Sequence, residues 1–205
     1  MKISNNIAAV ANVIYSEIQW QNFFSDEEIE RIITYCSSNE LVDGGVSTAH
    51  GIGIDKSTRI SKTNFHNFND QTSWIFNRFN FGIEDINNKF VHFDLYGYDA
   101  FQYSEYHAEE SGKYDFHMDM FMNNDCYQNK LTRKLSLVLL LSEPGVDFEG
   151  GEFQMTESSE TKLKTIAMKK GTLVTFPSFM IHRVTPVTKG IRSSIVIWVE
   201  GPKFK

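Results

Sequence analysis

The sequence predicts a mainly β fold with flanking helices, of the α+β class, whose core is a sandwich or barrel. Between about residues 91 and 201, eight short runs of β-branched or aromatic residues are separated by glycine and proline turns. One run, LSLVLLL at 135–141, is apolar on both faces, as a central strand should be. Earlier segments instead show apolar residues at helical spacing. With 205 residues and no repeat or linker, the chain is expected to form one domain.

Two helices are expected before the strands. Ser25 is the predicted N-cap of a helix over 25–38, and Glu28 completes a capping box. The apolar stripe of this helix recurs at Ile29, Ile32, Ile33 and Cys36. A second helix is predicted over 72–90, where Trp74, Ile75, Phe79 and Ile83 lie on roughly one side. Residues 39–63, rich in glycine, serine and threonine, are interpreted as a mobile loop.

The strand segments follow in order. They are VHFDLYGY (91–98), DAFQYSEY (99–106), KLSLVLLLS (134–142), GEFQMT (151–156), TKLKTIAM (161–168), GTLVTFPS (171–178), MIHRVTPV (180–187) and IRSSIVIWVEG (191–201). The last two are predicted to form a hairpin with its turn near VTKG, where Gly190 supplies the unusual backbone angles. His182 would then lie across from residues 194–196. On the outgoing strand Arg192, Ser194, Val196 and Trp198 would share one face, opposite a plain core face.

Composition excludes several classes of function. The formal net charge is −6 and no basic run occurs, which argues against a nucleic-acid partner. Only Cys36 and Cys126 are present, so no disulfide framework is implied and a reducing compartment is expected. The first 20 residues have a broken apolar run, too weak for a secretory signal and too short for a membrane span. A cytoplasmic protein without a membrane partner is therefore expected.

The stretch YDFHMDMF, residues 114–121, places His117 and Asp119 two positions apart among side chains suited to burial. Because a strand alternates faces with a period of two, both would project from the same side. An isolated pair of this kind is most often a hydrogen-bonded histidine beside a solvated carboxylate. If His182 faces the same cavity, two histidines and one carboxylate form the facial arrangement of non-haem Fe(II) oxygenases. Arg192, which needs a partner if buried, would suit the far carboxylate of a dicarboxylate cosubstrate.

Several segments together resemble the prolyl 4-hydroxylase-like group of 2-oxoglutarate/Fe(II) dioxygenases, and most closely its bacterial PKHD-type hydroxylases. Two of these segments are YHAEESGKYDFHMD (106–119) and RKLSLVLLLSEPGVDFEGGEF (133–153). The third is the final segment, in which His182 is followed by VTPVT, Gly190, Arg192 and Trp198. The resemblance covers about residues 22–201. It implies a double-stranded β-helix, or jelly-roll, core over about 91–201, preceded by a helical part over about 1–90.

The resemblance also implies roles for individual residues. His117, Asp119 and His182 match the iron ligands. Arg192 matches the residue that pairs with the distal carboxylate of 2-oxoglutarate, and Ser194 serves the same end. Some relatives carry a tyrosine where this chain reads LLLS, so Ser194 is expected to support Arg192 instead.

Aromatic residues complete the implied site. Tyr106 matches a tyrosine that lines the cosubstrate pocket, and Tyr114 matches one near the substrate entrance. Trp198 matches an aromatic residue beneath the metal. Candidates to exclude water from the site are Phe116, Met118, Phe121 and Trp198.

The activity implied is hydroxylation of an unactivated C–H bond by Fe(II), 2-oxoglutarate and O2, with succinate and CO2 as coproducts and ascorbate as an expected accessory. The resemblance favours a peptidyl proline as substrate, hydroxylated at C4. A free amino acid or small metabolite would fit the sequence equally well. Two other classes stay open, namely a Zn or Mn enzyme that uses no 2-oxo acid, and a non-enzymatic jelly-roll binding module.

Overall fold

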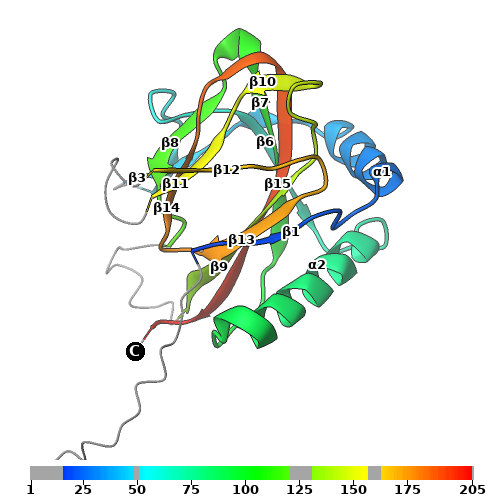
Figure 1. The fold of residues 1–205 in the computed structure, drawn as a ribbon, viewed down its shortest axis with the longest axis vertical. Coiled ribbons are helices and arrows are strands. Elements are labelled where there is room, and N and C mark those ends of the chain that lie inside the picture. The colour runs from blue at the N-terminus through cyan, green and yellow to red at the C-terminus, as the bar shows by residue number, and fades with distance from the viewer. Residues whose placement is uncertain (1–15, 49–50, 121–130, 157–162, 205) are drawn as a thin grey trace, which may run out of the picture.

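The protein consists of two antiparallel β-sheets that enclose an interior, with two helices outside one of them (Figure 1). The computed structural model describes residues 16–48, 51–120, 131–156 and 163–204. Within these residues no helix is long and apolar enough to cross a membrane. The two facing antiparallel sheets are those of the double-stranded β-helix expected from the sequence.

The larger sheet has eight strands. In spatial order they are Ile18–Trp20 (β1), Leu173–Pro177 (β13), Leu131–Leu140 (β9), Val187–Pro202 (β15), Ala100–His107 (β7), Lys62–Asn67 (β6) and Val42–Asp43 (β2), with Phe148–Gly150 (β10) pairing to β15. The smaller sheet has five, in the order Lys164–Ile166 (β12), Phe153–Thr156 (β11), Ile181–Val184 (β14), Lys113–His117 (β8) and Arg59–Ile60 (β5). A separate hairpin joins Val46–Thr48 (β3) to Gly51–Gly53 (β4).

Both predicted helices form. The first, α1 (Asp26–Ser37), has the capping box: the Glu28 N–H donates to the Ser25 hydroxyl, and the Ser25 N–H donates to the Glu28 carboxylate at 2.8 Å. The second, α2 (Ser73–Ile86), continues as a π-helical turn, Asn87–Val91. A separate short 3₁₀ turn, Ala108–Glu110, follows β7. Arg78 of α2 pairs with Glu28 at 2.9 Å, so the cap of one helix also joins the two helices.

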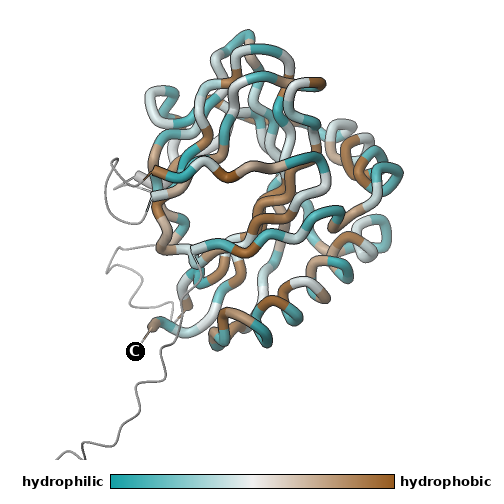
Figure 2. Tube along the Cα trace, in the orientation of Figure 1, coloured by the Kyte–Doolittle hydropathy of each residue, from teal (hydrophilic) through white to brown (hydrophobic). Residues whose placement is uncertain are grey.

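The apolar side chains form two clusters on opposite faces of the larger sheet. One lies under the helices and includes Leu135, Leu137 and Leu139 of β9. The other lies between the sheets and includes Val138 and Leu140 of the same strand. Figure 2 shows the hydrophobic stretches along the central strands and the inner sides of the helices. The prediction that this run is a central strand, apolar on both faces, is confirmed.

Two parts of the secondary-structure prediction are wrong. Residues 39–63, expected as a mobile loop, contain β2 to β5 and the start of β6. Residues 91–98, expected as a strand, form only an isolated bridge from Gly97 to Glu200. The π-helical turn ends at His92, which has a left-handed φ of 56°, and Asn87 caps it by hydrogen bonds to Phe93.

The predicted hairpin of 180–201 is also wrong, because β14 and β15 belong to different sheets. β14 pairs with β11 and β8, whereas β15 pairs with β9, β7 and β10. The VTKG segment pairs with β10 instead of forming a tight turn, and Gly190 (φ 68°) has no room for a Cβ against Asp147. His182 and Arg192 therefore reach the interior from opposite sheets and do not face each other across a ladder.

Candidate metal centre

The structure brings His117, Asp119 and His182 together at the inner strands β8 and β14 of the smaller sheet. His117 is the last residue of β8 and is directly paired with His182 of β14, and Asp119 follows two residues later. The Nε2 atoms of His117 and His182 lie 3.7 and 3.6 Å from the two carboxylate oxygens of Asp119. One candidate ligand atom from each residue lies within 4.8 Å of the others.

Backbone hydrogen bonds fix which nitrogen of each histidine is free. Nδ1 of His117 lies 2.8 Å from the carbonyl oxygen of Asp115, and Nδ1 of His182 lies 3.0 Å from that of Met180. A carbonyl oxygen only accepts hydrogen bonds, so both Nδ1 atoms carry the hydrogen. Each Nε2 then keeps a lone pair, which is the form of histidine that binds a metal.

The electrostatics of the three residues favour the same form. Burial lowers the pKa of His117 to about 3, and the nearby His182 adds to the effect. Burial alone would raise the pKa of Asp119, but the two histidines and a hydrogen bond from Ser136 hold it below its ordinary value. Near neutral pH the site therefore presents a neutral His117 and a carboxylate. With the free Nε2 of His182, this donor set fits Fe(II) and leaves other coordination positions open.

The carboxylate of Asp119, which is only 6% exposed, has a partner that sequence reasoning missed. The Ser136 hydroxyl donates to Oδ2 of Asp119 at 2.7 Å and also contacts the Ser178 hydroxyl at 2.9 Å. The available signal was that Ser136 is the one polar residue in the run LSLVLLL.

Aromatic rings surround the two histidines. The ring of Tyr114 stacks on His117 with 3.6 Å between centroids. The guanidinium of Arg59 lies over the Tyr114 ring, 4.7 Å from its centroid. Phe176 and Phe153 pack against His182 at 4.8 and 5.6 Å. These rings, of which sequence reasoning named only Tyr114, form the apolar surroundings of the site.

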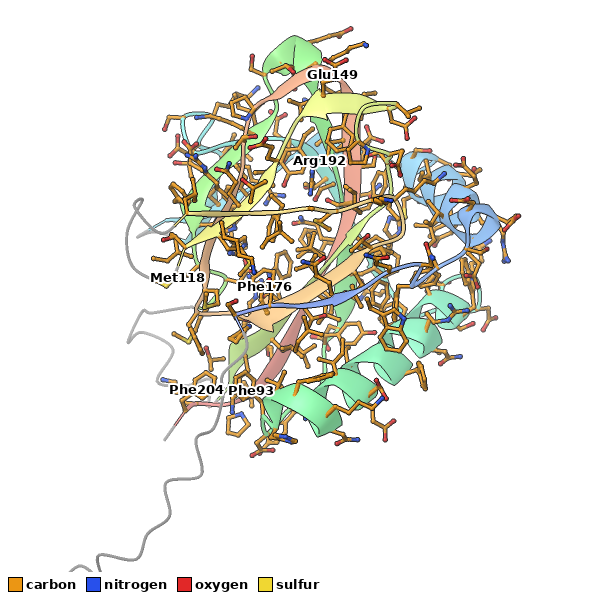
Figure 3. The ribbon with its side chains drawn as sticks, in the orientation of Figure 1. Phe93, Met118, Glu149, Phe176, Arg192 and Phe204 are labelled. Atoms are coloured by element: carbon orange, nitrogen blue, oxygen red, sulfur yellow. The ribbon has the colours of Figure 1, made fainter. Side chains whose placement is uncertain are left out.

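The residues expected to exclude water are placed differently. Phe116 lies under the guanidinium of Arg183, at 4.3 Å, and its strand neighbours His117 and Tyr114 make the contacts in the site. Met118 is 38% exposed and lies at the edge of the molecule (Figure 3). Phe121 lies outside the described residues.

Arg192 is buried between the sheets without an acidic partner among the described residues. Its side chain is 1% exposed, and burial lowers its pKa. Nη1 donates a long hydrogen bond to Ser194 at 3.3 Å, and the guanidinium lies 5.5 Å from the ring centroid of Tyr106. Nη2 has no partner in the part of the chain that the structure describes. Arg192 lines a cavity of about 170 Å³ beside Leu140 and Phe153, and Figure 3 shows it in the interior above Phe176. The unsatisfied guanidinium fits an anionic ligand.

A second cavity, of about 490 Å³, lies beside β15 and the start of β7. It is lined by Arg133 and Trp198, with the guanidinium 4.0 Å from the indole centroid. Trp198 is the strand partner of Ser136, whose hydroxyl donates to the Asp119 carboxylate. The buried indole N–H of Trp198 has no acceptor among the described residues. Trp198 is thus linked to the ligand set through its strand partner Ser136 and lines the cavity together with Arg133.

Comparison with known proteins supports the resemblance seen in the sequence. Residues 101–200 match the sequence profile of the 2OG-Fe(II) oxygenase superfamily. The segment contains every candidate metal ligand, together with Arg192, Ser194 and Tyr106. The resemblance to 2-oxoglutarate/Fe(II) oxygenases is therefore confirmed.

Similar proteins include PKHD-type hydroxylases from two Synechococcus strains. The one from strain CC9311 is 35% identical over 94 residues, 46% of this chain and 39% of the relative. The one from strain JA-2-3B'a(2-13) is 38% identical over 93 residues, 45% of this chain and 40% of the relative. The match thus spans about two fifths of the length of these relatives.

Solved structures with the same fold include prolyl hydroxylases. A Pseudomonas putida prolyl-4-hydroxylase has a TM-score of 0.69 at 18% identity, covering 92% of this chain and 94% of that one. A viral collagen prolyl hydroxylase from Paramecium Bursaria Chlorella virus-1, solved with 2OG, has a TM-score of 0.70 at 20% identity, covering 91% and 97%. At these identities the likeness concerns the fold.

Proposed function

We propose that this chain, which carries a 2OG-Fe(II) oxygenase region at residues 101–200, is a 2-oxoglutarate- and Fe(II)-dependent dioxygenase that hydroxylates an unactivated C–H bond. The observation that carries the proposal is the pairing of two features in one interior. Two histidines with free Nε2 atoms meet a carboxylate, and Arg192 lies buried without an anionic partner among the described residues.

The proposed reaction consumes the substrate, 2-oxoglutarate and O2, and gives hydroxylated substrate, succinate and CO2. One atom of O2 enters the substrate and the other enters succinate. Fe(II) held by His117, Asp119 and His182 would supply the activation of O2 that these organic side chains cannot provide. The apolar rings of Phe153 and Phe176 on the smaller and larger sheets keep water away from His182.

The protein's own contribution to cosubstrate binding is assigned to Arg192, Ser194 and Tyr106. The planar guanidinium presents Nη2 and its other N–H groups in a fork that suits a carboxylate. Ser194 supports that fork from two residues along the same strand, and the ring of Tyr106 lies beneath it. A dianionic five-carbon 2-oxo acid would place one carboxylate on the arginine and its 2-oxo acid end toward the ligand set.

For the substrate, we propose a peptidyl proline, hydroxylated at C4. Support comes from the solved prolyl hydroxylases with this fold and from the larger cavity beside Trp198. That cavity has an aromatic wall, a cation in Arg133 and an unused N–H donor in Trp198, features that suit a proline ring with its flanking peptide carbonyl groups. A free amino acid or small metabolite is the alternative outcome of the test.

The test uses the purified chain with Fe(II), ascorbate, O2 and 2-oxoglutarate, and a panel of proline-containing peptides and free amino acids. Succinate and CO2 are measured together with the mass of each candidate substrate. The expected result is a gain of one oxygen in a peptide, dependent on 2-oxoglutarate. A gain in a free amino acid instead would move the substrate class to small molecules. Absence of 2-oxoglutarate consumption from the iron-loaded protein would contradict the proposed activity.

A further inference from the structure

The backbone around Asp119 is held by Ser178. Strand β8 ends at His117, so Asp119 lies beyond the regular ladder. The carbonyl oxygen of Ser178 accepts hydrogen bonds from the N–H groups of Asp119 and Met120, at 3.0 and 2.9 Å. The Ser178 N–H in turn donates to the carbonyl oxygen of Lys134 on β9 at 3.0 Å. Ser178, which directly follows β13 of the larger sheet, therefore anchors the segment that carries the carboxylate.

The carboxylate itself is held by a directional pair of hydroxyl groups. Ser136 lies 2.7 Å from Oδ2 of Asp119 and 2.9 Å from the hydroxyl of Ser178. A carboxylate only accepts, and each hydroxyl has one hydrogen, so Ser136 donates to Asp119 and Ser178 donates to Ser136. Both serines are fully buried, and water has no access to replace either bond. Hydrogen bonds linked in this way in a buried site strengthen one another.

We infer that Ser136, oriented by Ser178, is a positioning residue that makes Asp119 bind the metal through Oδ1 alone. The inference rests on the proposed function. Both carboxylate oxygens lie close to a histidine Nε2, Oδ1 at 3.7 Å from that of His117 and Oδ2 at 3.6 Å from that of His182. The hydrogen bond from Ser136 withdraws electron density from Oδ2, so Oδ1 remains the better donor to a metal. Binding through one oxygen leaves three positions of a six-coordinate ion open. 2-Oxoglutarate needs two of these positions and O2 needs the third.

Ser178 also connects the hydrogen bond between Ser136 and Asp119 to the third candidate ligand, His182. It lies between β13 and β14, four residues before His182. The same short connection therefore sets the position of the second histidine and, through Ser136, the orientation of the carboxylate. A change in either hydroxyl is expected to alter metal binding without touching a ligand.

The first measurement is Mn(II) affinity, determined by calorimetric titration of the metal-free protein without O2. Ser136→Ala is expected to weaken Mn(II) binding about 10- to 100-fold, the usual effect of removing a group that orients a metal ligand. Ser178→Ala should weaken it less, because the bond from Ser136 to Asp119 remains. The matched control is Thr175→Val on β13, where the buried hydroxyl has no partner among the residues described and affinity should be unchanged.

The second measurement is the affinity of the Mn(II)-loaded protein for 2-oxoglutarate, again without O2. Ser136→Ala should bind it more weakly, because a carboxylate that turns to two-oxygen binding occupies a position the cosubstrate needs. Ser136→Thr restores the hydroxyl and should recover both affinities. Failure of a folded threonine variant to recover either affinity would show that packing, not the hydrogen bond, matters.

The outcomes separate this inference from the proposed function. Wild-type affinities in Ser136→Ala would overturn the role of the serine while leaving the metal site intact. A wild-type protein that binds no Mn(II) would instead contradict the proposed function. If Ser136→Ala does not fold, Ser178→Ala is used to test the inference instead. Wild-type affinities for Mn(II) and 2-oxoglutarate in that variant would overturn it.

Discussion

Arg192 is the residue whose surroundings most clearly require a ligand. A guanidinium buried without a carboxylate costs several kcal/mol of stability unless other groups compensate. Among the described residues it has a long bond to Ser194 and the face of Tyr106, and Nη2 remains without a partner. Such a residue is expected to gain its partner when an anion binds.

The first prediction concerns Arg192→Ala. Truncation of one partner in a buried, hydrogen-bonded charge pair costs about 2–5 kcal/mol, so 2-oxoglutarate affinity should fall by at least about 30-fold. Mn(II) affinity should stay within about twofold of the wild type, because the arginine holds no metal ligand. Both affinities are measured by calorimetric titration without O2.

Arg183→Ala is the matched control for this prediction. Arg183 is adjacent to His182 in sequence, but its guanidinium lies on Phe116 and bonds to Gln154 at 2.8 Å. Its removal should leave both affinities unchanged. Equal loss of metal and 2-oxoglutarate binding in Arg192→Ala would show that the arginine only supports the fold.

The second prediction concerns acid stability and His66, a buried residue outside the site. Its ring lies between Tyr35 and Phe101, and Nε2 donates to Oδ1 of Asn64, whose amide donates to the carbonyl oxygen of Cys36. Burial lowers the pKa of His66 below 6.5. The unfolded chain therefore takes up a proton first, and stability present above about pH 6.5 is lost as the pH falls toward the folded pKa.

His66→Gln should weaken this pH dependence. Glutamine keeps an N–H donor for Asn64 but takes up no proton, so its loss of stability between about pH 7.5 and 5 should be smaller. Urea unfolding at both pH values measures the effect as a difference between variant and wild type. An equal loss of stability in the variant and the wild type would show that His66 does not contribute to the pH dependence.

At this scale the sequence located the ligands but not their support. The spacing of His117 and Asp119 was weak evidence alone, and it pointed to the site only together with His182, Arg192 and the family pattern. Ser136 and Ser178 are ordinary polar residues at the level of sequence. Their hydrogen bonds depend on β9, β13 and the segment after β8 meeting in space. A local sequence pattern does not predict tertiary contacts of this kind.

Among the elements, long periodic segments were predictable and short ones were not. The helices and the strands β7, β9, β13 and β15 follow their apolar periods and lie close to the predicted ranges. The strands within residues 39–63 are only two or three residues long, apart from the start of β6, and glycines lie in β4 and between β2 and β3. Their pairing with β6 and β8 comes from tertiary contacts that propensity does not describe.

The third prediction concerns the capping box of α1. Ser25→Ala removes the hydroxyl that accepts from the Glu28 N–H and should lower the free energy of unfolding by about 1 kcal/mol. Mn(II) affinity should not change, since the helix packs outside the larger sheet. Denaturant unfolding and Mn(II) titration test the two statements together.

Ser38→Ala at the other end of the helix is the control. Its hydroxyl donates to an exposed carbonyl oxygen of Tyr35, so its loss should change stability by less than about 0.5 kcal/mol. A fall in Mn(II) affinity in Ser25→Ala would contradict the separation between the helical layer and the site.

At the scale of the whole molecule, the site exists because two sheets face each other. The candidate metal ligands come from β14, β8 and the segment after β8 in the smaller sheet, and Arg192 comes from the larger one. Periodicity predicted which face each side chain takes, but not which sheet each strand joins. That is why the expected hairpin between His182 and Arg192 was wrong although both residues reach the same interior. The helices cover the outer face of the larger sheet, so the interior is the place for a ligand (Figure 1).

A crystal structure of the protein with Mn(II) and 2-oxoglutarate, prepared without O2, tests the central claim most directly. We expect one Mn(II) ion bound by Nε2 of His117, Oδ1 of Asp119 and Nε2 of His182. The distal carboxylate of 2-oxoglutarate should pair with Arg192. A metal bound elsewhere, or a 2-oxoglutarate molecule that does not contact Arg192, would contradict the account.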